Sequence, residues 1–313
     1  MDNCWERSLP FVELDRDTVS CLVHRCDPGL TVETITPVRE GCRASTYCIR
    51  VEGGTRFLLK WFATDDESWE REHQLFSLLQ GDVPMPRLYF AGNDEVLHGS
   101  FALYEFICGV SLRDALQSGV RPGDELVECL GRVAAFIHQH TYGAVGFLDG
   151  GLKVKQMLPP VTEWYSLFLG SRATARLGPE LTAEIRKLVE AGRSELESLD
   201  HCPALVHGDF RPTNIMVSNQ HLSGIVDWEF AMAGHPLSDV AQFFRYSEDF
   251  GERERKMFER GYRSVPGMQL SPGWERIGRL RDLTNLLQMI DAEGERPLKD
   301  EDLKHLIEST LSS

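Results

Sequence analysis

The stretch LVHGDFRPTNIMV at residues 205–217 places a polar loop between two short apolar runs. The runs at its two ends have the composition of short buried strands, so the loop between them is held at both sides. Its polar residues include Asp209 and Asn214. An acidic and amide-bearing loop fixed between strands predicts a binding or catalytic site. The alternative is a tight polar turn whose side chains only cap backbone groups.

A second apolar run, Gly224–Val226, can fold back on Ile215–Val217 through a short polar turn and form an antiparallel hairpin. Asn214 enters the first strand of this hairpin and Asp227 leaves the second, so we expect the two side chains to lie level. Magnesium prefers oxygen ligands, which an Asn and Asp pair supplies together with substrate phosphates. Asp209 then stays free to receive the proton of a hydroxyl group. This division of labour is that of kinase phosphoryl transfer.

The string H-G-D-x-x-x-x-N, followed by D-W-E, resembles the aminoglycoside phosphotransferase family and its choline-kinase-like and fructosamine-kinase-like relatives. A eukaryotic protein kinase would instead show H-R-D, D-F-G and A-P-E. The resemblance implies an α+β fold with two lobes, like that of protein kinases. An antiparallel-sheet lobe at residues 1–107 would bind the nucleotide, and a mainly helical lobe at residues 108–313 would carry the catalytic loop and the acceptor site. It also implies that Asp209 is catalytic and that Asn214 and Asp227 hold Mg²⁺.

Lys60 ends the apolar strand RFLLK, and a buried lysine charge needs a partner. On the helix that follows, at about residues 68–80, helical spacing places Glu72 on the apolar face. We therefore predict that Glu72 pairs with Lys60, as in the kinase pair whose lysine holds the nucleotide phosphates. The alternatives are a purely structural ion pair, or a Lys60 side chain that reaches solvent.

The loop EGCRAST at residues 40–46 corresponds, in the resemblance, to the loop that covers the nucleotide phosphates. Its small residues, with free backbone N–H groups, would contact phosphate oxygens there, and we count Ser45 and Thr46 among the nucleotide-binding residues. The loop holds one glycine and is not G-x-G-x-x-G, so an ordinary hairpin turn would look similar.

SFALYEFI at residues 100–107 reads as the last strand before the crossing to the second lobe. By the resemblance, Glu105 and Ile107 would offer a backbone C=O and N–H to the purine, and Tyr104 would stand at the back of its pocket. A bulky residue at that position leaves the choice between ATP and GTP open.

Two further motifs lie near the loop. GHPLSDVAQFF at residues 234–244 resembles the family's G-D-P-x-x-D-L-A, with His235 in place of the first Asp. Asp239 would accept hydrogen bonds from the catalytic-loop backbone, or else only cap its helix. Glu229 would bind a substrate amine, tune the metal or face solvent. We assign His207 a supporting role, because a lone histidine at a strand end is usually structural.

Helical periodicity predicts several helices in the second lobe. Asp124 is expected to cap one that ends near His138, a charged amphipathic helix is expected at 181–199, and a C-terminal helix at 277–290. Residues 146–200 would shape the acceptor site, as inserted helices do in the resembled family.

Composition limits the kinds of partner and the cellular location that we expect for this protein. The net charge of −15 argues against nucleic acid or an anionic membrane as partner and fits a cationic small molecule, although solubility alone would also account for it. No apolar run reaches membrane-spanning length and the start, MDNCWERSLP, lacks a signal-like pattern, so we expect a cytoplasmic protein. The eight cysteines include no C-x-x-C pair and are read as reduced core residues.

Together these features predict a small-molecule kinase, monomeric or weakly dimeric, that uses Mg²⁺ to move the γ-phosphate of ATP or GTP to a hydroxyl group. The acceptor would be cationic, with an aminoglycoside-type antibiotic as the first choice. Choline-like, amino-sugar and macrolide acceptors stay open, as does a catalytically silent nucleotide-binding module. A protein kinase is disfavoured, because no A-P-E segment follows Asp227.

Overall fold

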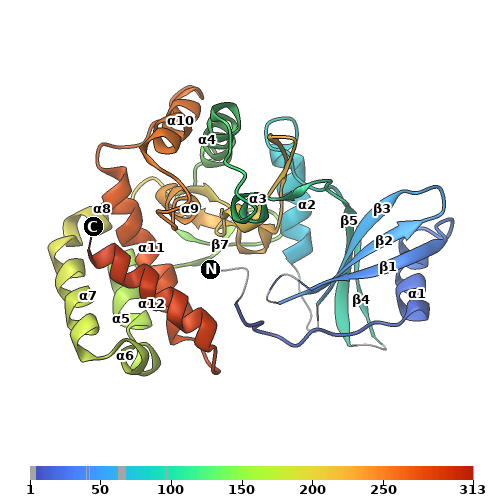
Figure 1. Cartoon of the computed structure of the whole chain (residues 1–313), viewed down its shortest axis with the longest axis horizontal. Coiled ribbons are helices and arrows are strands. Elements are labelled where there is room, and N and C mark those ends of the chain that lie inside the picture. The colour runs from blue at the N-terminus through green and yellow to red at the C-terminus, as the bar shows by residue number, and fades with distance from the viewer. Residues whose placement is uncertain (1–4, 40, 42, 63–67, 96–97, 313) are drawn as a thin grey trace.

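The chain folds into two lobes, one built on a sheet and one mainly of helices (Figure 1), as a computed structural model of residues 5–39, 41, 43–62, 68–95 and 98–312 shows. This arrangement confirms the predicted α+β, kinase-like fold class. Glu40 and Cys42 of the expected phosphate-covering loop lie outside the described residues.

The N-terminal lobe is a five-stranded antiparallel sheet with the strand order β1-β2-β3-β5-β4. Its strands are β1 (Val32–Val38), β2 (Ser45–Val51), β3 (Arg56–Phe62), β4 (Leu88–Asp94) and β5 (Gly99–Glu105). Alternation along each strand gives the sheet two apolar faces. One packs against α1 (Arg16–Cys26) through Val19, Leu22 and Val23. The other face carries Lys60 and Tyr104, and α2 (Ser68–Leu79) packs near its β4 edge.

The two lobes are joined by residues 106–109, between the end of β5 and the short strand β6 (Val110–Ser111). The expected division after residue 107 falls in this connection. β6 pairs with β10 (Ile215–Ser218) and so already belongs to the C-terminal lobe. Gly109 permits this turn, because its φ is +132° and a Cβ there would lie 2.3 Å from the Val217 carbonyl oxygen.

The C-terminal lobe surrounds one large apolar core. Its helices are α3 (Leu112–Gln117), α4 (Asp124–His138), α5 (Val161–Phe168), α6 (Ser171–Leu177), α7 (Pro179–Ala191), α8 (Arg193–Ser198), α9 (Leu237–Phe243), α10 (Glu252–Arg263), α11 (Trp274–Asp291) and α12 (Pro297–Leu311). Its other strands are β7 (Gly146–Leu148), β8 (Val154–Met157), β9 (Ala204–Val206), β11 (His221–Ile225) and β12 (Met232–Gly234), with two 3₁₀ turns, η2 (Pro212–Asn214) and η3 (Trp228–Phe230).

α4 and α10 pack closely because each has a glycine at the contact. A Cβ on Gly131 would lie 2.0 Å from the Phe258 carbonyl oxygen, and one on Gly261 would lie 1.8 Å from that of Glu128. Larger residues at either position would hold the two helices apart.

Three helix predictions need correction. Gly123, not Asp124, is the N-cap of α4, and Asp124 is the first helical residue. The segment expected as one helix at 181–199 is two helices, α7 and α8, which meet at Gly192. α11 is not the last helix, because α12 follows it after a short turn. In each case periodicity identified the helix but not where it ends.

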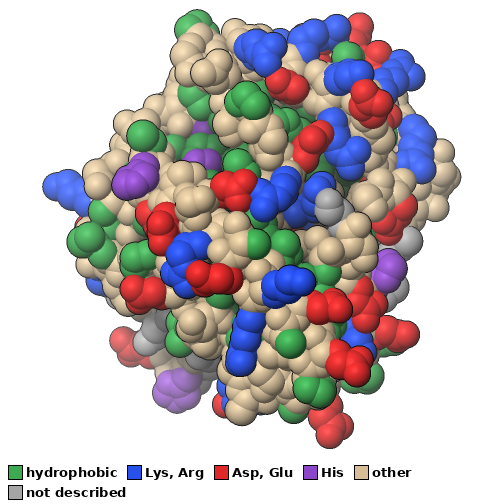
Figure 2. Space-filling model, turned by 90° about the vertical axis from the view of Figure 1, so that its left-hand side faces the viewer, with side chains coloured by type: hydrophobic (Ala, Val, Ile, Leu, Met, Phe, Trp, Pro, Cys, Tyr) green, Lys and Arg blue, Asp and Glu red, His purple; other side chains and the backbone are tan. Residues whose placement is uncertain are grey.

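The six cysteines in the described part of the chain are free thiols as expected, but none of them is fully buried. Cys21, Cys108 and Cys202 are exposed, and Cys26, Cys48 and Cys129 are half-buried; all six are free thiols. In the part of the chain that the structure describes, no helix is both long and apolar enough to cross a bilayer. Figure 2 shows the end of the molecule formed by the C-terminal lobe, where basic and acidic side chains are interspersed. Ion pairs such as Arg276–Glu195 occur in this lobe.

Candidate active site

The loop after β9 is fixed by a buried carboxylate. Asp239 on α9 is fully buried, and its two oxygens accept the backbone N–H groups of His207 (2.7 Å) and Gly208 (2.9 Å). His138 on α4 contacts the same carboxylate through Nε2 at 3.1 Å. These bonds confirm that Asp239 holds the backbone of the loop.

A second side chain of α9, Gln242, forms hydrogen bonds with the backbone of the next turn of the loop. Its Oε1 accepts from Phe210 N–H and its Nε2 donates to the Gly208 carbonyl, both at 2.9 Å. Gly208 has a φ of +80°, and a Cβ there would meet the Phe230 carbonyl oxygen at 2.2 Å, so only glycine fits. Sequence analysis missed Gln242, although it lies three residues after Asp239 and therefore on the same face of the helix.

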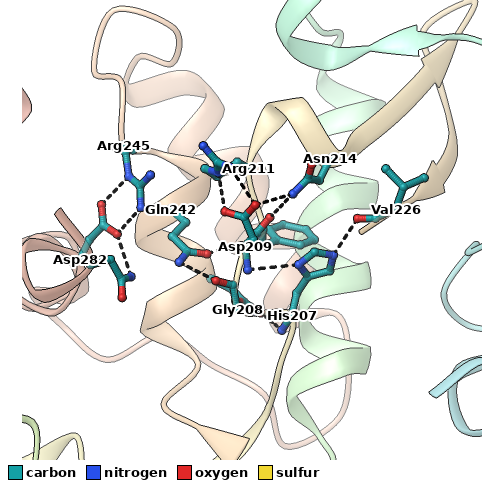
Figure 3. Close-up of polar contacts among 12 residues, drawn as sticks. His207, Gly208, Asp209, Arg211, Asn214, Val226, Gln242, Arg245 and Asp282 are labelled. Atoms are coloured by element: carbon teal, nitrogen blue, oxygen red, sulfur yellow. Dashed lines mark hydrogen bonds and ion pairs between the residues drawn. The ribbon is translucent and has the colours of Figure 1, made fainter. Parts of the chain in front are cut away.

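His207 is satisfied as a neutral ring. Its Nδ1 accepts the N–H of Asp209 at 3.2 Å, and its Nε2 donates to the Val226 carbonyl at 3.0 Å (Figure 3). Burial lowers the pKa of His207 below its usual value, despite the nearby carboxylate of Asp239. The ring therefore connects the loop to the hairpin, which is a supporting role as predicted for His207.

Asp209 is surrounded by donors. The Arg211 guanidinium donates to both of its oxygens, from Nε to Oδ1 at 2.5 Å and from Nη2 to Oδ2 at 2.8 Å, and Asn214 Nδ2 adds a bond to Oδ2 at 2.8 Å (Figure 3). Burial would raise the pKa of Asp209, but Arg211 holds that pKa below the usual range. The carboxylate is therefore ionised at neutral pH. No role was predicted for Arg211, although it lies only two residues from Asp209 in the chain.

The predicted hairpin is present. β10 and β11 pair antiparallel with Ile215 opposite Ile225, and the N–H of Val226 donates to the Asn214 carbonyl at 2.9 Å. Asn214 therefore lies opposite Val226 and not level with Asp227 as expected. Asp227 follows directly in the left-handed region, at φ 70°. Asp tolerates this conformation better than most residues, and such backbone positions cluster at functional sites.

Lys60 contacts Asp227 and not the partner that the sequence predicted. Its Nζ lies 2.6 Å from Asp227 Oδ1, which joins β3 of the sheet lobe to the end of the hairpin. Burial would lower the pKa of Lys60, but the carboxylates of Asp227 and then Glu72 hold that pKa above its usual value. Among the described residues, Lys60 forms no ion pair with Glu72.

Glu72 does lie on the buried face of α2, as helical spacing predicted. Its Oε2 accepts the Tyr104 hydroxyl at 2.8 Å, and its Oε1 has no hydrogen-bond partner within the described ranges. Burial raises the pKa of Glu72, while the nearby charge of Lys60 opposes that rise. The Glu72 carboxylate thus acts on the charge of Lys60 without forming an ion pair with it.

The two residues of β2 that were predicted to bind the nucleotide, Ser45 and Thr46, point to opposite faces of the sheet. Ser45 is 2% exposed and its Oγ accepts the N–H of Val12, so its side chain points away from the face that carries Lys60, and a phosphate contact through its backbone N–H stays a prediction. Thr46 pairs with Lys60 across the sheet, and its side chain lies on the same face as Lys60.

At the other end of the sheet, β5 ends at Glu105, so Ile107 lies in the connection and not in the strand. The N–H of Glu105 donates to Arg87 within the sheet. The backbone C=O of Glu105 and N–H of Ile107 stay candidate purine contacts.

Glu229 sits beside the proposed metal residues. Its backbone carbonyl accepts Arg71 Nη2 of α2 at 2.6 Å. Burial, together with the adjacent Asp227 carboxylate, raises the pKa of Glu229 to about 7. This side chain can therefore exchange a proton near neutrality.

Asn214 and Asp227 fit a magnesium ion by donor type. The amide nitrogen of Asn214 is committed to Asp209, which leaves its oxygen for a cation, and Asp227 supplies a carboxylate. No cluster of three or more His, Cys, Asp or Glu ligands occurs in the ranges that the structure covers. Such a site would take its remaining ligands from water and nucleotide phosphates, as magnesium sites in kinases do.

Solved structures share this architecture. The chain superimposes on an aminoglycoside 2′-phosphotransferase in complex with GDP with a TM-score of 0.70 and 18% identity, over 95% of this chain and 98% of that one. For the aminoglycoside phosphotransferase APH(4)-Ia the TM-score is 0.67, with 16% identity over 94% and 98% of the two chains. For a proposed fructosamine-3-kinase of Thermobifida fusca it is 0.67, with 18% identity over 96% and 100%. At these identities the likeness establishes the fold.

Fold and loop together define a kinase-type phosphotransferase. The model of the phosphotransferase enzyme family (APH) matches residues 34–279, so the chain belongs to that family. It is therefore a phosphotransferase.

Curated relatives are considerably longer. Acyl-CoA dehydrogenase family member 11 of Rattus norvegicus is 27% identical over 277 residues, covering 81% of this chain and 33% of the relative. A probable acyl-CoA dehydrogenase of Arabidopsis thaliana is 26% identical over 214 residues, covering 65% and 25%. The chain thus spans a quarter to a third of the length of these relatives, and their names describe the longer proteins.

Proposed function

We propose that the protein transfers the γ-phosphate of ATP or GTP to a hydroxyl of a small molecule at Asp209. The observation that carries this proposal is the convergence of three charged or amide groups on the loop and hairpin with a lysine from the other lobe. Asp209 is ionised, Asn214 contacts it directly, and Lys60 of the sheet lobe contacts Asp227.

In this reaction Asp209 orients the acceptor hydroxyl and takes its proton. The acceptor oxygen bonds to the γ-phosphorus as the bond from that phosphorus to the β–γ bridging oxygen breaks, and the nucleoside diphosphate leaves. Lys60 neutralises phosphate charge, and Asn214 with Asp227 would hold Mg²⁺, which supplies further charge neutralisation when bound. Because the transition state of phosphoryl transfer is loose, most of the rate comes from positioning and electrostatics.

For the acceptor we propose a cationic, aminoglycoside-type molecule, with choline-like, amino-sugar and macrolide compounds as alternatives. The net charge of −15 supports a cation, and a related APH(4)-Ia structure holds ADP and hygromycin B.

The test is nucleotide consumption by the purified protein with Mg²⁺ and either ATP or GTP, against a panel of all these acceptor classes. Asp209→Asn should lower kcat about 10²–10⁴-fold, with the nucleotide Kd nearly unchanged. Asp17→Asn, an exposed carboxylate on α1, is the matched control and should leave both constants unchanged. Equal loss of turnover and nucleotide binding in Asp209→Asn would refute the assigned role. Nucleotide binding with no acceptor turnover would favour the silent module.

A further inference from the structure

The segment Trp5–Leu14 spans both lobes. Trp5 packs against the core of the C-terminal lobe, whereas Phe11, Val12 and Leu14 pack against the core of the sheet lobe. In Figure 1 it runs as the dark blue chain from α1, below the sheet, to the N-terminal label between the lobes. The lobes are therefore tied by this strap as well as by the connection at 106–109.

The strap is specifically docked on α12. Trp5 Nε1 donates to Asp302 Oδ2 at 2.9 Å, and the Tyr246 hydroxyl donates to the same oxygen at 2.7 Å. The Glu6 carboxylate accepts the N–H groups of Leu298 and Lys299 at 2.9 and 3.1 Å. N–H groups in the first turn of a helix have no intrahelical partner, so a carboxylate is favoured there.

Trp5 also reaches the catalytic loop. The Arg211 guanidinium lies 5.5 Å from the centre of the Trp5 ring, while its N–H groups hold both oxygens of Asp209. A guanidinium near an aromatic ring is attracted by its π-electrons. Trp5 therefore restrains Arg211, and Arg211 restrains Asp209.

Arg7, two residues after Trp5 in the strap, holds the loop before β2. Arg7 donates to the Gly41 carbonyl at 2.5 Å and to the Ala44 carbonyl at 2.8 Å. One short segment thus contacts the loop expected to cover the phosphates and the loop that carries Asp209. Both the strap and α12 lie outside the family match at 34–279.

We propose that Trp5 is a positioning residue, which orients Asp209 toward the acceptor hydroxyl through Arg211. Through Arg7, the same strap couples the orientation of Asp209 to the position of the phosphate-covering loop. The proposal rests on the proposed function of Asp209. It assigns the strap a part in catalysis although none of its residues contacts the transferred phosphate.

Kinetics of Trp5→Ala and Trp5→Phe test the proposal, with the acceptor found by the panel. Trp5→Ala should lower kcat at least about tenfold while the nucleotide Kd stays within about twofold, because a misaimed base slows the chemical step. Trp5→Phe keeps the ring and should restore most of kcat. Tyr89→Ala is the matched control, because Tyr89 is a half-exposed aromatic paired with Arg87 away from the strap, and it should behave as wild type.

Hydrogen exchange at residues 207–214 gives a readout that needs no turnover. Trp5→Ala should speed exchange in this loop more than in the β-sheet, and Trp5→Phe should not. If kcat of Trp5→Ala stays within about twofold of wild type, or if exchange rises equally throughout the chain, the positioning role is wrong. Absent turnover in the wild type counts against the proposed function alone, since the exchange measurement still decides the role of Trp5.

Discussion

Tyr104 donates its hydroxyl to Glu72 Oε2 at 2.8 Å, and both residues are buried. This bond connects β5 to α2 on the face of the sheet that carries Lys60. It gives Glu72 a partner that the sequence did not reveal, and it leaves Oε1 unpaired among the described residues.

Tyr104→Phe should lower the free energy of unfolding by about 1–3 kcal/mol, because it leaves a buried carboxylate oxygen without its donor. Urea denaturation followed by circular dichroism measures the change. Tyr89→Phe, at a half-exposed tyrosine, should cost much less. Equal effects of the two changes would show that the Tyr104 bond adds no stability.

Lys60→Met should weaken nucleotide binding at least about tenfold, because it removes the cation that would meet the phosphates. Titration calorimetry with Mg²⁺ and each nucleotide measures the loss. Lys155→Met removes an exposed lysine from β8 and serves as the control for net charge. If both variants bind alike, Lys60 has no direct part in phosphate binding.

Asp239→Asn should destabilise the protein by about 3–5 kcal/mol, because an amide replaces a buried carboxylate that accepts from His207, Gly208 and His138. Its NH₂ group can only donate, so at least one of these donors loses its acceptor. Thermal and urea unfolding measure the effect against Asp17→Asn. A stability close to wild type would mean that the loop is held chiefly by Gln242.

His235 should make stability depend on pH below neutrality. Burial lowers the pKa of His235 to about 4, with Arg281 and His138 adding to the effect, against 6.5 for an ordinary histidine. Between these values the unfolded chain binds a proton that the folded chain does not, so acid favours unfolding. The contribution is complete above pH 6.5 and is lost as the pH falls toward 4.

Replacing His235 tests this directly. His235→Asn keeps an acceptor for the Leu237 N–H, which His235 Nδ1 accepts at 3.1 Å, and removes the titration. Between pH 7 and 5 the wild type should lose about 2 kcal/mol more unfolding free energy than this variant. Parallel pH curves for the two proteins would show that His235 titrates normally in the folded state.

The sequence by itself determined the local parts of the site. Ile215–Val217 and Gly224–Val226 form the predicted hairpin, because two apolar runs joined by a short polar turn can pair antiparallel, but Asn214 lies opposite Val226 and not level with Asp227. Helical spacing likewise placed Glu72 on the buried face of α2, whereas the contact of Asp239 with the loop backbone was implied by the resemblance to the family.

The tertiary structure alone decided which distant groups meet. Lys60 contacts Asp227, which is 167 residues away in the chain, and Ser45 turns from the face that carries Lys60 to accept the N–H of Val12. Trp5 reaches Arg211 across both lobes. Periodicity shows which face of a helix or strand is buried. Packing of the whole core decides which other element covers that face and which group becomes the partner of each buried charge.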